Sequence, residues 1–138
     1  MLRFLILLSF TVFLVSCKKE NNTPEQPVDE MAPPGMEIVK GTFTSTPGHN
    51  VSGTAKIFED NGRKELRLEN FSSTNGPDLR VYLSKDLSAS SFISLGSLKS
   101  VSGNQNYVIT GMPDFTEFKH VLIWCEQFTV LFGSATIN

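Results

Sequence analysis

Residues 51–71 read VSGTAKIFEDNGRKELRLENF, and they are the part of the sequence that most clearly indicates the fold. In residues 51–58, small or apolar side chains alternate with mostly polar ones, and in residues 64–71 leucines alternate with charged residues. A period of two is typical of a half-buried β-strand. Asn61-Gly62 separates the two runs, and this pair accepts the positive φ angles of a tight hairpin turn. The stretch therefore predicts a β-hairpin within an all-β domain.

The same kind of pattern recurs on both sides of this hairpin. Short alternating runs, broken by turn residues, predict further strands at residues 38–44, 79–84, 92–98, 105–110, 120–126 and 128–137. In the second of these, Leu79, Val81 and Leu83 should face the core, and Arg80, Tyr82 and Ser84 should face water. Eight strands within about 100 residues predict a single antiparallel β-sandwich or small barrel. Residues 112–118 hold Pro113 and two acids, which predict a helical turn or two.

Aromatic residues supply the volume of the predicted core. Eight of the eleven phenylalanines lie in residues 37–138, together with Trp124, Tyr82 and Tyr107. A core of this size needs no disulfide bonds. On the last two predicted strands, Ile123, Cys125, Val130 and Phe132 should point inward, and Phe128 should continue the apolar face.

The N-terminus predicts export. Residues 1–16 carry a cationic start followed by an apolar run that is too short for a transmembrane helix, as in a secretory signal peptide. The sequence Leu14-Val15-Ser16-Cys17 resembles the lipobox of bacterial lipoproteins, in which the cysteine is acylated and becomes the mature N-terminus. The alternative is an ordinary signal peptide with a chance cysteine. We expect a protein that is lipid-anchored to a bacterial cell-envelope membrane through Cys17.

Residues 17–36 predict a disordered linker, because they hold four prolines and few large apolar side chains. The globular domain should then span residues 37–138. It contains nine basic and ten acidic residues without a charge run. Nucleic acid is therefore excluded as a partner, since its binding requires clustered cations. Contact with the membrane should come from the lipid on Cys17.

A search for catalytic motifs finds no nucleophile elbow, no phosphate-binding glycine loop and no His-Glu-x-x-His pair. The two histidines are His49 and His120. His120 and Cys125 are five residues apart on one predicted strand, so they should point to opposite faces, which disfavours a catalytic dyad. His49 can reach Cys125 only through the fold. We therefore expect no enzyme activity.

Metal motifs are equally sparse. A blue-copper site needs histidine and usually methionine near its cysteine, and neither residue follows Cys125. A structural zinc site needs four ligands, and the chain has too few cysteines and histidines. A b-type haem held by His49 or His120 and a methionine stays open, because such ligands have no fixed spacing. The cofactor is thus left unassigned.

Two polar loops are candidate sites. In Asn75-Gly76-Pro77-Asp78, the side chain of Asp78 could act as a ligand or base, but aspartate more commonly organises its own turn. The stretch Gly103-Asn104-Gln105-Asn106-Tyr107 enters a predicted strand, and the same interpretation applies to it.

An ordered series of short motifs resembles one known family. The series comprises Gly41-x-Phe43, His49-x-x-x-Gly53, Asn70-Phe71, Gly76-Pro77-Asp78-Leu79-x-Val81-Tyr82-Leu83-Ser84, Leu95-Gly96-x-Leu98-Lys99, Gly103-Asn104-Gln105-Asn106-Tyr107 and Val121-x-Ile123-Trp124-Cys125-x-x-Phe128-x-Val130-x-Phe132-Gly133-x-Ala135. It is similar to the bacterial lipoprotein branch of the DM-thirteen family, also called the electron-transfer DM-thirteen domain. The resemblance implies a β-rich domain, one characteristic cysteine that maps onto Cys125, and a role in electron transfer or redox chemistry.

Two functions follow from these observations. The first is a redox or electron-transfer accessory module centred on Cys125, with His49 as a possible second ligand and a redox or envelope protein as partner. The second is a non-catalytic binding or adhesion module in which Cys125 packs in the core. A reactive thiol needs thiolate character and access, whereas the apolar neighbours of Cys125 predict burial. Exposure of Cys125 therefore distinguishes the two hypotheses.

Overall fold

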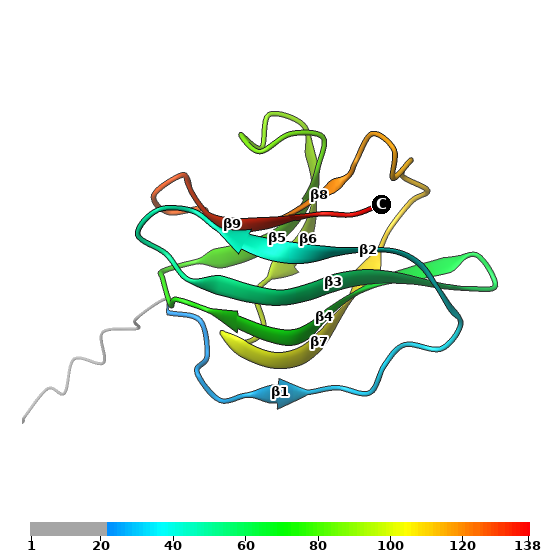
Figure 1. The fold of residues 1–138 in the computed structure, drawn as a ribbon, viewed down its shortest axis with the longest axis horizontal. Coiled ribbons are helices and arrows are strands. Elements are labelled where there is room, and N and C mark those ends of the chain that lie inside the picture. The colour runs from blue at the N-terminus through cyan, green and yellow to red at the C-terminus, as the bar shows by residue number, and fades with distance from the viewer. Residues whose placement is uncertain (1–21) are drawn as a thin grey trace, which may run out of the picture.

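The computed structural model describes residues 22–138, which fold into one curled β-sheet (Figure 1). The strands are β1 (Val28–Asp29), β2 (Met36–Ser45), β3 (Val51–Asp60), β4 (Arg63–Ser73), β5 (Leu79–Ser84), β6 (Phe92–Ser97), β7 (Ser102–Ile109), β8 (His120–Cys125) and β9 (Val130–Thr136). The predicted signal peptide (residues 1–16) and Cys17 lie outside the described residues. No helix in the described part of the chain is long and apolar enough to cross a membrane.

The strands follow the order β1-β7-β4-β3-β2-β9-β8-β5-β6 across the sheet. The prediction of an all-β fold is confirmed, and each of the eight predicted strands has its counterpart among β2 to β9. The sheet is a half-barrel of mixed type, because the additional strand β1 pairs parallel to β7. It differs in this from the fully antiparallel sandwich or barrel that was predicted.

Strand β2 joins the two halves of the sheet, pairing with β3 along Met36–Thr42 and with β9 along Phe43–Ser45. At Gly41 the backbone of β2 comes so close to the end of β9 that a Cβ atom would collide with the backbone oxygen of Thr136. A residue without a side chain is needed at such an approach. This close contact fixes the point where the sheet curls.

The hairpin predicted from residues 51–71 is present. Asp60 pairs with Arg63, and the two turn residues Asn61 and Gly62 have φ angles of 51° and 82°. Both angles are positive, as a two-residue type I′ turn requires. Strands β3 and β4 then alternate as expected, with Ala55, Ile57 and two leucines of β4 fully buried.

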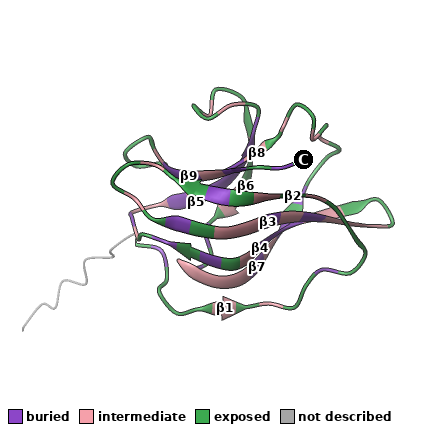
Figure 2. Ribbon diagram, in the orientation of Figure 1, coloured by how far each residue is buried: buried purple, intermediate pink, exposed green. Residues whose placement is uncertain are grey.

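The concave side of the sheet holds the inner core, in which most side chains are less than 6% exposed. The inner core consists of Phe43, Val51, Ala55, Ile57, Leu66, Leu68, Phe71, Leu79, Val81, Leu83, Leu98, Tyr107, Ile109, Val121, Ile123, Cys125, Phe132, Ala135 and Ile137. Figure 2 shows these buried stretches along the strands. Removing this apolar surface from water is the dominant stabilising term of the fold.

The structure corrects the prediction of a disordered linker over residues 22–36, the described part of residues 17–36. This segment runs along the edge of the sheet and contains β1, although most of it is solvent-exposed (Figure 2). Polar bonds hold it: Lys99 Nζ lies 2.6 Å from Glu30 Oε1, and the Ser100 hydroxyl donates to Gln26 O at 2.7 Å. Amino-acid composition reports how much apolar surface a segment can bury but not which polar bonds it forms, and polar bonds hold this segment.

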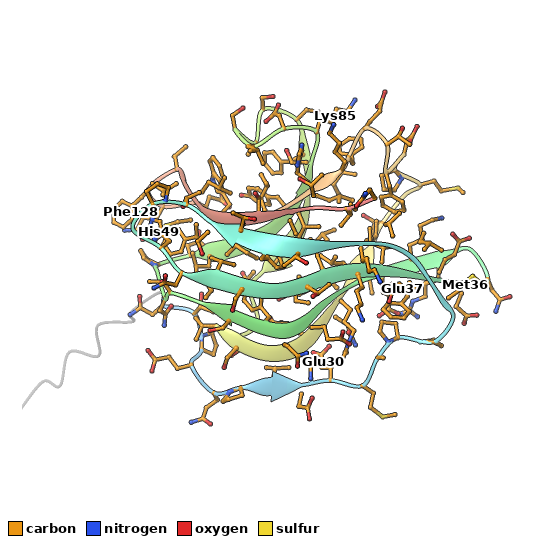
Figure 3. The ribbon with its side chains drawn as sticks, in the orientation of Figure 1. Glu30, Met36, Glu37, His49, Lys85 and Phe128 are labelled. Atoms are coloured by element: carbon orange, nitrogen blue, oxygen red, sulfur yellow. The ribbon has the colours of Figure 1, made fainter. Side chains whose placement is uncertain are left out.

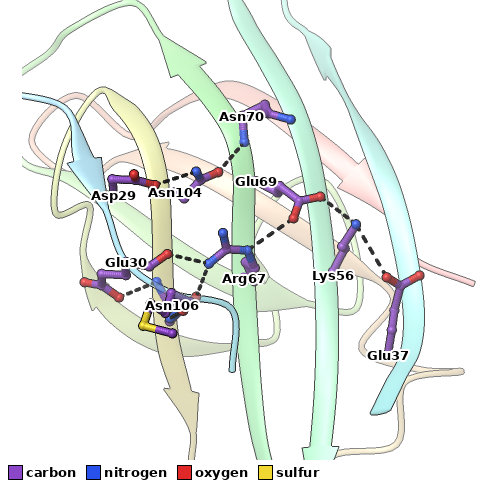
Figure 4. Close-up of polar contacts among 10 residues, drawn as sticks. Asp29, Glu30, Glu37, Lys56, Arg67, Glu69, Asn70, Asn104 and Asn106 are labelled. Atoms are coloured by element: carbon purple, nitrogen blue, oxygen red, sulfur yellow. Dashed lines mark hydrogen bonds and ion pairs between the residues drawn. The ribbon is translucent and has the colours of Figure 1, made fainter. Parts of the chain in front are cut away.

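Charged side chains cover the outer face of β2, β3 and β4, and the amide side chains of Asn104 and Asn106 continue the row on β7 (Figure 4). Lys56 Nζ lies between Glu37 and Glu69, and Arg67 Nε donates to Glu69 at 3.3 Å. The guanidinium of Arg67 also donates through Nη1 to Glu30 O at 2.9 Å, so it ties the N-terminal segment to β4. These ion pairs and hydrogen bonds explain how the charged residue Arg67 can be only 5% exposed.

At residues 112–118, where a helical turn or two was predicted, hydrogen bonds from the amides of Glu117 and Phe118 to Asp114 O close a single turn, without a regular helix. The prediction for residues 128 and 130 is wrong. Phe128 and Val130, expected to continue the apolar face, are 63% and 36% exposed. They occupy the turn between β8 and β9 and the first position of β9, beyond the end of the inner core.

Candidate functional site

Cys125 is the last residue of β8, where it pairs with Leu79 of β5 and Val130 of β9. Its side chain points into the inner core beside Val121 and Ile123, and its exposed fraction is 0%. The predicted face of β8 is thus confirmed. A sulfur atom in this position cannot meet a reagent or a partner unless the fold opens locally.

The thiol of Cys125 has a hydrogen-bond partner. Its Sγ donates to the carbonyl oxygen of Pro77 at 3.0 Å, in the loop that precedes β5. The same loop is held to β8 by a bond from the Glu126 amide to Asp78 O at 3.1 Å. The sulfur therefore packs as a small apolar group with a satisfied weak donor, which is the ordinary role of a buried cysteine.

His49, the predicted second ligand, lies in the loop between β2 and β3. Its ring stacks on Phe132 with 3.8 Å between the ring centroids, and its Nδ1 is buried without a hydrogen-bond partner. The hydrogen bond of Cys125 goes to Pro77 and not to His49. The structure therefore does not join the two predicted residues directly, and residues 22–138 contain no group of three or more potential metal ligands.

His120 begins β8 on the side opposite Cys125. Its Nδ1 lies 3.1 Å from the hydroxyl oxygen of Thr136 on β9. Burial, followed by the nearby charge of Lys119, lowers the pKa of His120. The two residues cannot act together on one substrate, which agrees with the prediction that they face opposite ways.

The loop of residues 75–78 is built differently from the prediction. The Asp78 carboxylate accepts a hydrogen bond from Arg80 Nε at 2.6 Å and does not organise the turn. Asn75 does so instead, because its Oδ1 accepts from the amides of Gly76 at 2.8 Å and Thr23 at 3.2 Å. An asparagine at the first turn position is a known way to replace backbone hydrogen bonds, so the residue that indicates the turn stands three positions before Asp78.

The second polar stretch is structural. Gln105 is fully buried, and its Oε1 accepts from the Tyr107 hydroxyl at 2.6 Å and the Ser100 amide at 3.2 Å. Its Nε2 donates to Ser100 O at 2.9 Å. Burial raises the pKa of Tyr107. Every polar group of Gln105 is thereby satisfied, as a buried amide requires.

Aromatic residues also pack on the outer face of β5 and β8, where the sequence predicted solvent. They form a second cluster, here called the outer aromatic cluster. It consists of Tyr82, Leu122 and Trp124, and Ala89 and Leu131 pack against it. The Tyr82 hydroxyl donates to Glu126 Oε2 at 2.8 Å, and burial together with this carboxylate raises the pKa of Tyr82 to about 12. The uninterrupted run of apolar residues at 121–125 could have indicated this burial, since such a run is typical of a strand buried on both faces.

A pocket of about 480 Å³ lies beside the start of β8, where Lys119 precedes His120. Val39, Phe115 and Ile137 form its apolar walls, and Lys119 and Asp114 are among its polar residues. Hydrogen bonds from Thr116 hold the pKa of Asp114 below its usual value. Its volume is in the range of small-molecule sites, and it shares no lining residue with the Cys125 region.

One family model matches residues 42–137, under the description electron transfer DM13. Neither a curated protein nor a solved structure matches the chain. The matched segment includes every strand from β3 to β9 and the last four residues of β2, and it covers more than half of the chain. The chain belongs to the DM13 family, whose description is electron transfer.

Proposed function

We propose that this protein is a lipid-anchored accessory module of a bacterial cell envelope that serves an electron-transfer system by binding a partner through its surface, with Cys125 as a structural residue. The family description supports the redox context. The sequence Leu14-Val15-Ser16-Cys17 supports the anchor and the export.

One observation carries the structural role of Cys125. The sulfur is 0% exposed and donates its hydrogen bond to Pro77 O at 3.0 Å. A lone thiol that served redox chemistry would have to bind a metal, form a mixed disulfide or pass through a sulfenic acid. Each of these reactions needs a thiolate that is accessible. The burial of Cys125 therefore favours a module that works through its surface.

The second candidate is a redox module in which Cys125 itself reacts. The family description favours it, and so does the position of the sulfur under a single loop, residues 75–78. In this case the loop opens before the thiol meets its partner, and His49 Nδ1, which is buried without a hydrogen-bond partner, is the predicted second ligand.

The test uses full-length protein purified from membranes of its native host. Intact-mass analysis should show acyl groups on Cys17, and Cys17→Ser should remove them. Absorption spectra, metal analysis and a reductive titration are then compared for the native protein and Cys125→Ala. We expect the two proteins to give the same result. A chromophore, a metal or an electron equivalent that disappears in Cys125→Ala would establish the second candidate instead.

A further inference from the structure

Three loops meet at one end of the sheet, and the described chain begins at the same end (Figure 1). They are residues 46–50, 74–78 and 126–129, and with Asn22 they form what we call the tether end. Asn22 forms an antiparallel bridge with Pro77 of the second loop. Backbone bonds join the loops, from the Thr74 amide to Asn50 O at 2.8 Å and from the Glu126 amide to Asp78 O at 3.1 Å.

We propose that the tether end rests on the bilayer surface and that Phe128 inserts into its interface. This inference rests on the proposed acylation of Cys17. Five residue steps separate Cys17 from Asn22, and five residues span at most about 18 Å. Whatever path these residues take, an acylated Cys17 holds the tether end within that distance of the membrane, whereas it sets no such limit for the opposite end of the sheet.

The chemistry of Phe128 fits this position. Phe128 is 63% exposed and belongs to the turn of residues 126–129, although most of the other large aromatic residues within residues 22–138 are buried. Figure 3 shows Phe128 at the same end as His49, whereas the exposed Met36 lies at the opposite end. An aromatic ring moves favourably from water into the headgroup region of a bilayer. Phe92, which is also partly exposed, already stacks on Tyr82 at 4.1 Å.

The charges of the tether end allow a close approach to headgroups. Its loops hold two carboxylates, Asp78 and Glu126. Arg80 Nε lies 2.6 Å from Asp78 Oδ1 and 3.5 Å from Glu126 Oε2, and Glu126 also accepts the hydroxyl of Tyr82. Both carboxylates therefore have partners within the protein. Contact with the membrane would not strip water from an unpaired charge, which would be costly.

Depth-dependent quenching tests the inference on full-length, acylated protein in vesicles of phosphatidylethanolamine and phosphatidylglycerol that carry brominated phosphatidylcholine. Trp124 is the only tryptophan, so Trp124→Phe provides a background without tryptophan fluorescence. Phe128→Trp and the matched control Met36→Trp, which is 72% exposed at the far end, are then compared in this background. We expect the brominated lipid to remove most of the emission from position 128 and almost none from position 36.

A second measurement keeps Trp124 in place. A nitroxide attached at Gln127→Cys or, as its control, at Asn61→Cys in the hairpin turn reports collisions with oxygen, which is concentrated in the lipid, and with a water-soluble nickel complex. Acylated protein in which neither probe distinguishes the two ends would overturn the inference and leave the anchor intact. Protein whose intact mass shows no acyl group would overturn the anchor and the inference together.

Discussion

The two halves of the sheet share one inner core but differ on their outer faces. In the half formed by β1, β7, β4, β3 and β2, the outer face carries a row of side chains that are charged on β2, β3 and β4 and amides on β7 (Figure 4). In the half formed by β9, β8, β5 and β6, the outer aromatic cluster covers β5 and β8, and residues 85–91 fold against it through Ala89. Strands β5 and β8 are thus buried on both faces, whereas β6 is partly exposed. Cys125 lies on β8, and its side chain is buried on the inner face, in the core that both halves share.

The largest effect should come from the inner core that both halves share. Phe132 is 6% exposed and stacks on His49, so Phe132→Ala should lower the free energy of unfolding by about 3–5 kcal/mol through lost burial and a cavity. Phe128→Ala, four residues earlier and exposed, is the matched control and should change it by no more than about 0.5 kcal/mol. Chemical denaturation measures both. Equal effects of the two substitutions would contradict the assignment of faces on β9.

The outer faces themselves can be compared by one substitution in each half. Leu122 belongs to the outer aromatic cluster and is fully buried, so Leu122→Ala should cost about 2–5 kcal/mol. Lys56 lies on the outer face of the charged half, where an exposed ion pair is worth at most about 1 kcal/mol. Lys56→Ala should therefore cost about 1 kcal/mol or less in the same denaturation experiment. A reversed order would mean that the aromatic half is not sealed by its outer cover.

Substitutions of Cys125 should have intermediate effects. Cys125→Ala removes the donor to Pro77 O, and a buried acceptor left without its partner costs about 1–3 kcal/mol. Cys125→Ser keeps a donor at that position, so it should destabilise the protein less than Cys125→Ala. Chemical denaturation of the two variants measures the difference between their free energies of unfolding. A serine variant less stable than the alanine variant would show that the bond to Pro77 contributes little.

The smallest effect concerns pH. The hydroxyl of Tyr82 titrates near pH 12 in the folded protein but near 10 when unfolded. Its contribution to stability is complete below pH 10 and is lost as the pH rises from about 10 to 12, because the unfolded state releases this proton first. Absorbance of the tyrosinate should therefore show a delayed titration of Tyr82, measured in a Tyr107→Phe background because burial also raises the pKa of Tyr107. Glu126→Gln should lower the pKa of Tyr82 without returning it to 10, since burial is the larger cause.

The sequence was sufficient to predict strands and side-chain directions where one face of a strand is exposed to solvent. Alternation predicted β3 and β4 and the direction of Cys125, and Asn61-Gly62 predicted the turn between the strands. It failed where both faces are buried, because Tyr82 on an alternating strand was assigned to solvent. Which loop covers an outer face depends on residues distant in sequence, and no local period reports it.

The candidate site was predictable to a similar extent. Its central residue and the face of that residue followed from the sequence, whereas the partner of its thiol did not. Pro77 offers a backbone carbonyl, a group present at every residue, so no side-chain pattern could identify it. The docking of residues 22–36 was missed for the same reason, because backbone groups such as Glu30 O and Gln26 O hold that segment.

The rate at which a thiol reagent labels Cys125 is the most direct test of whether Cys125 is a structural residue. The measurement uses folded protein at neutral pH, with Gln127→Cys in the Cys125→Ala background as an exposed single-cysteine control. If Cys125 is structural, its labelling should be far slower than that of the control and should accelerate with denaturant as the fold opens. Labelling of folded wild-type protein at the rate of the control, independent of denaturant, would contradict the account and favour a reactive Cys125.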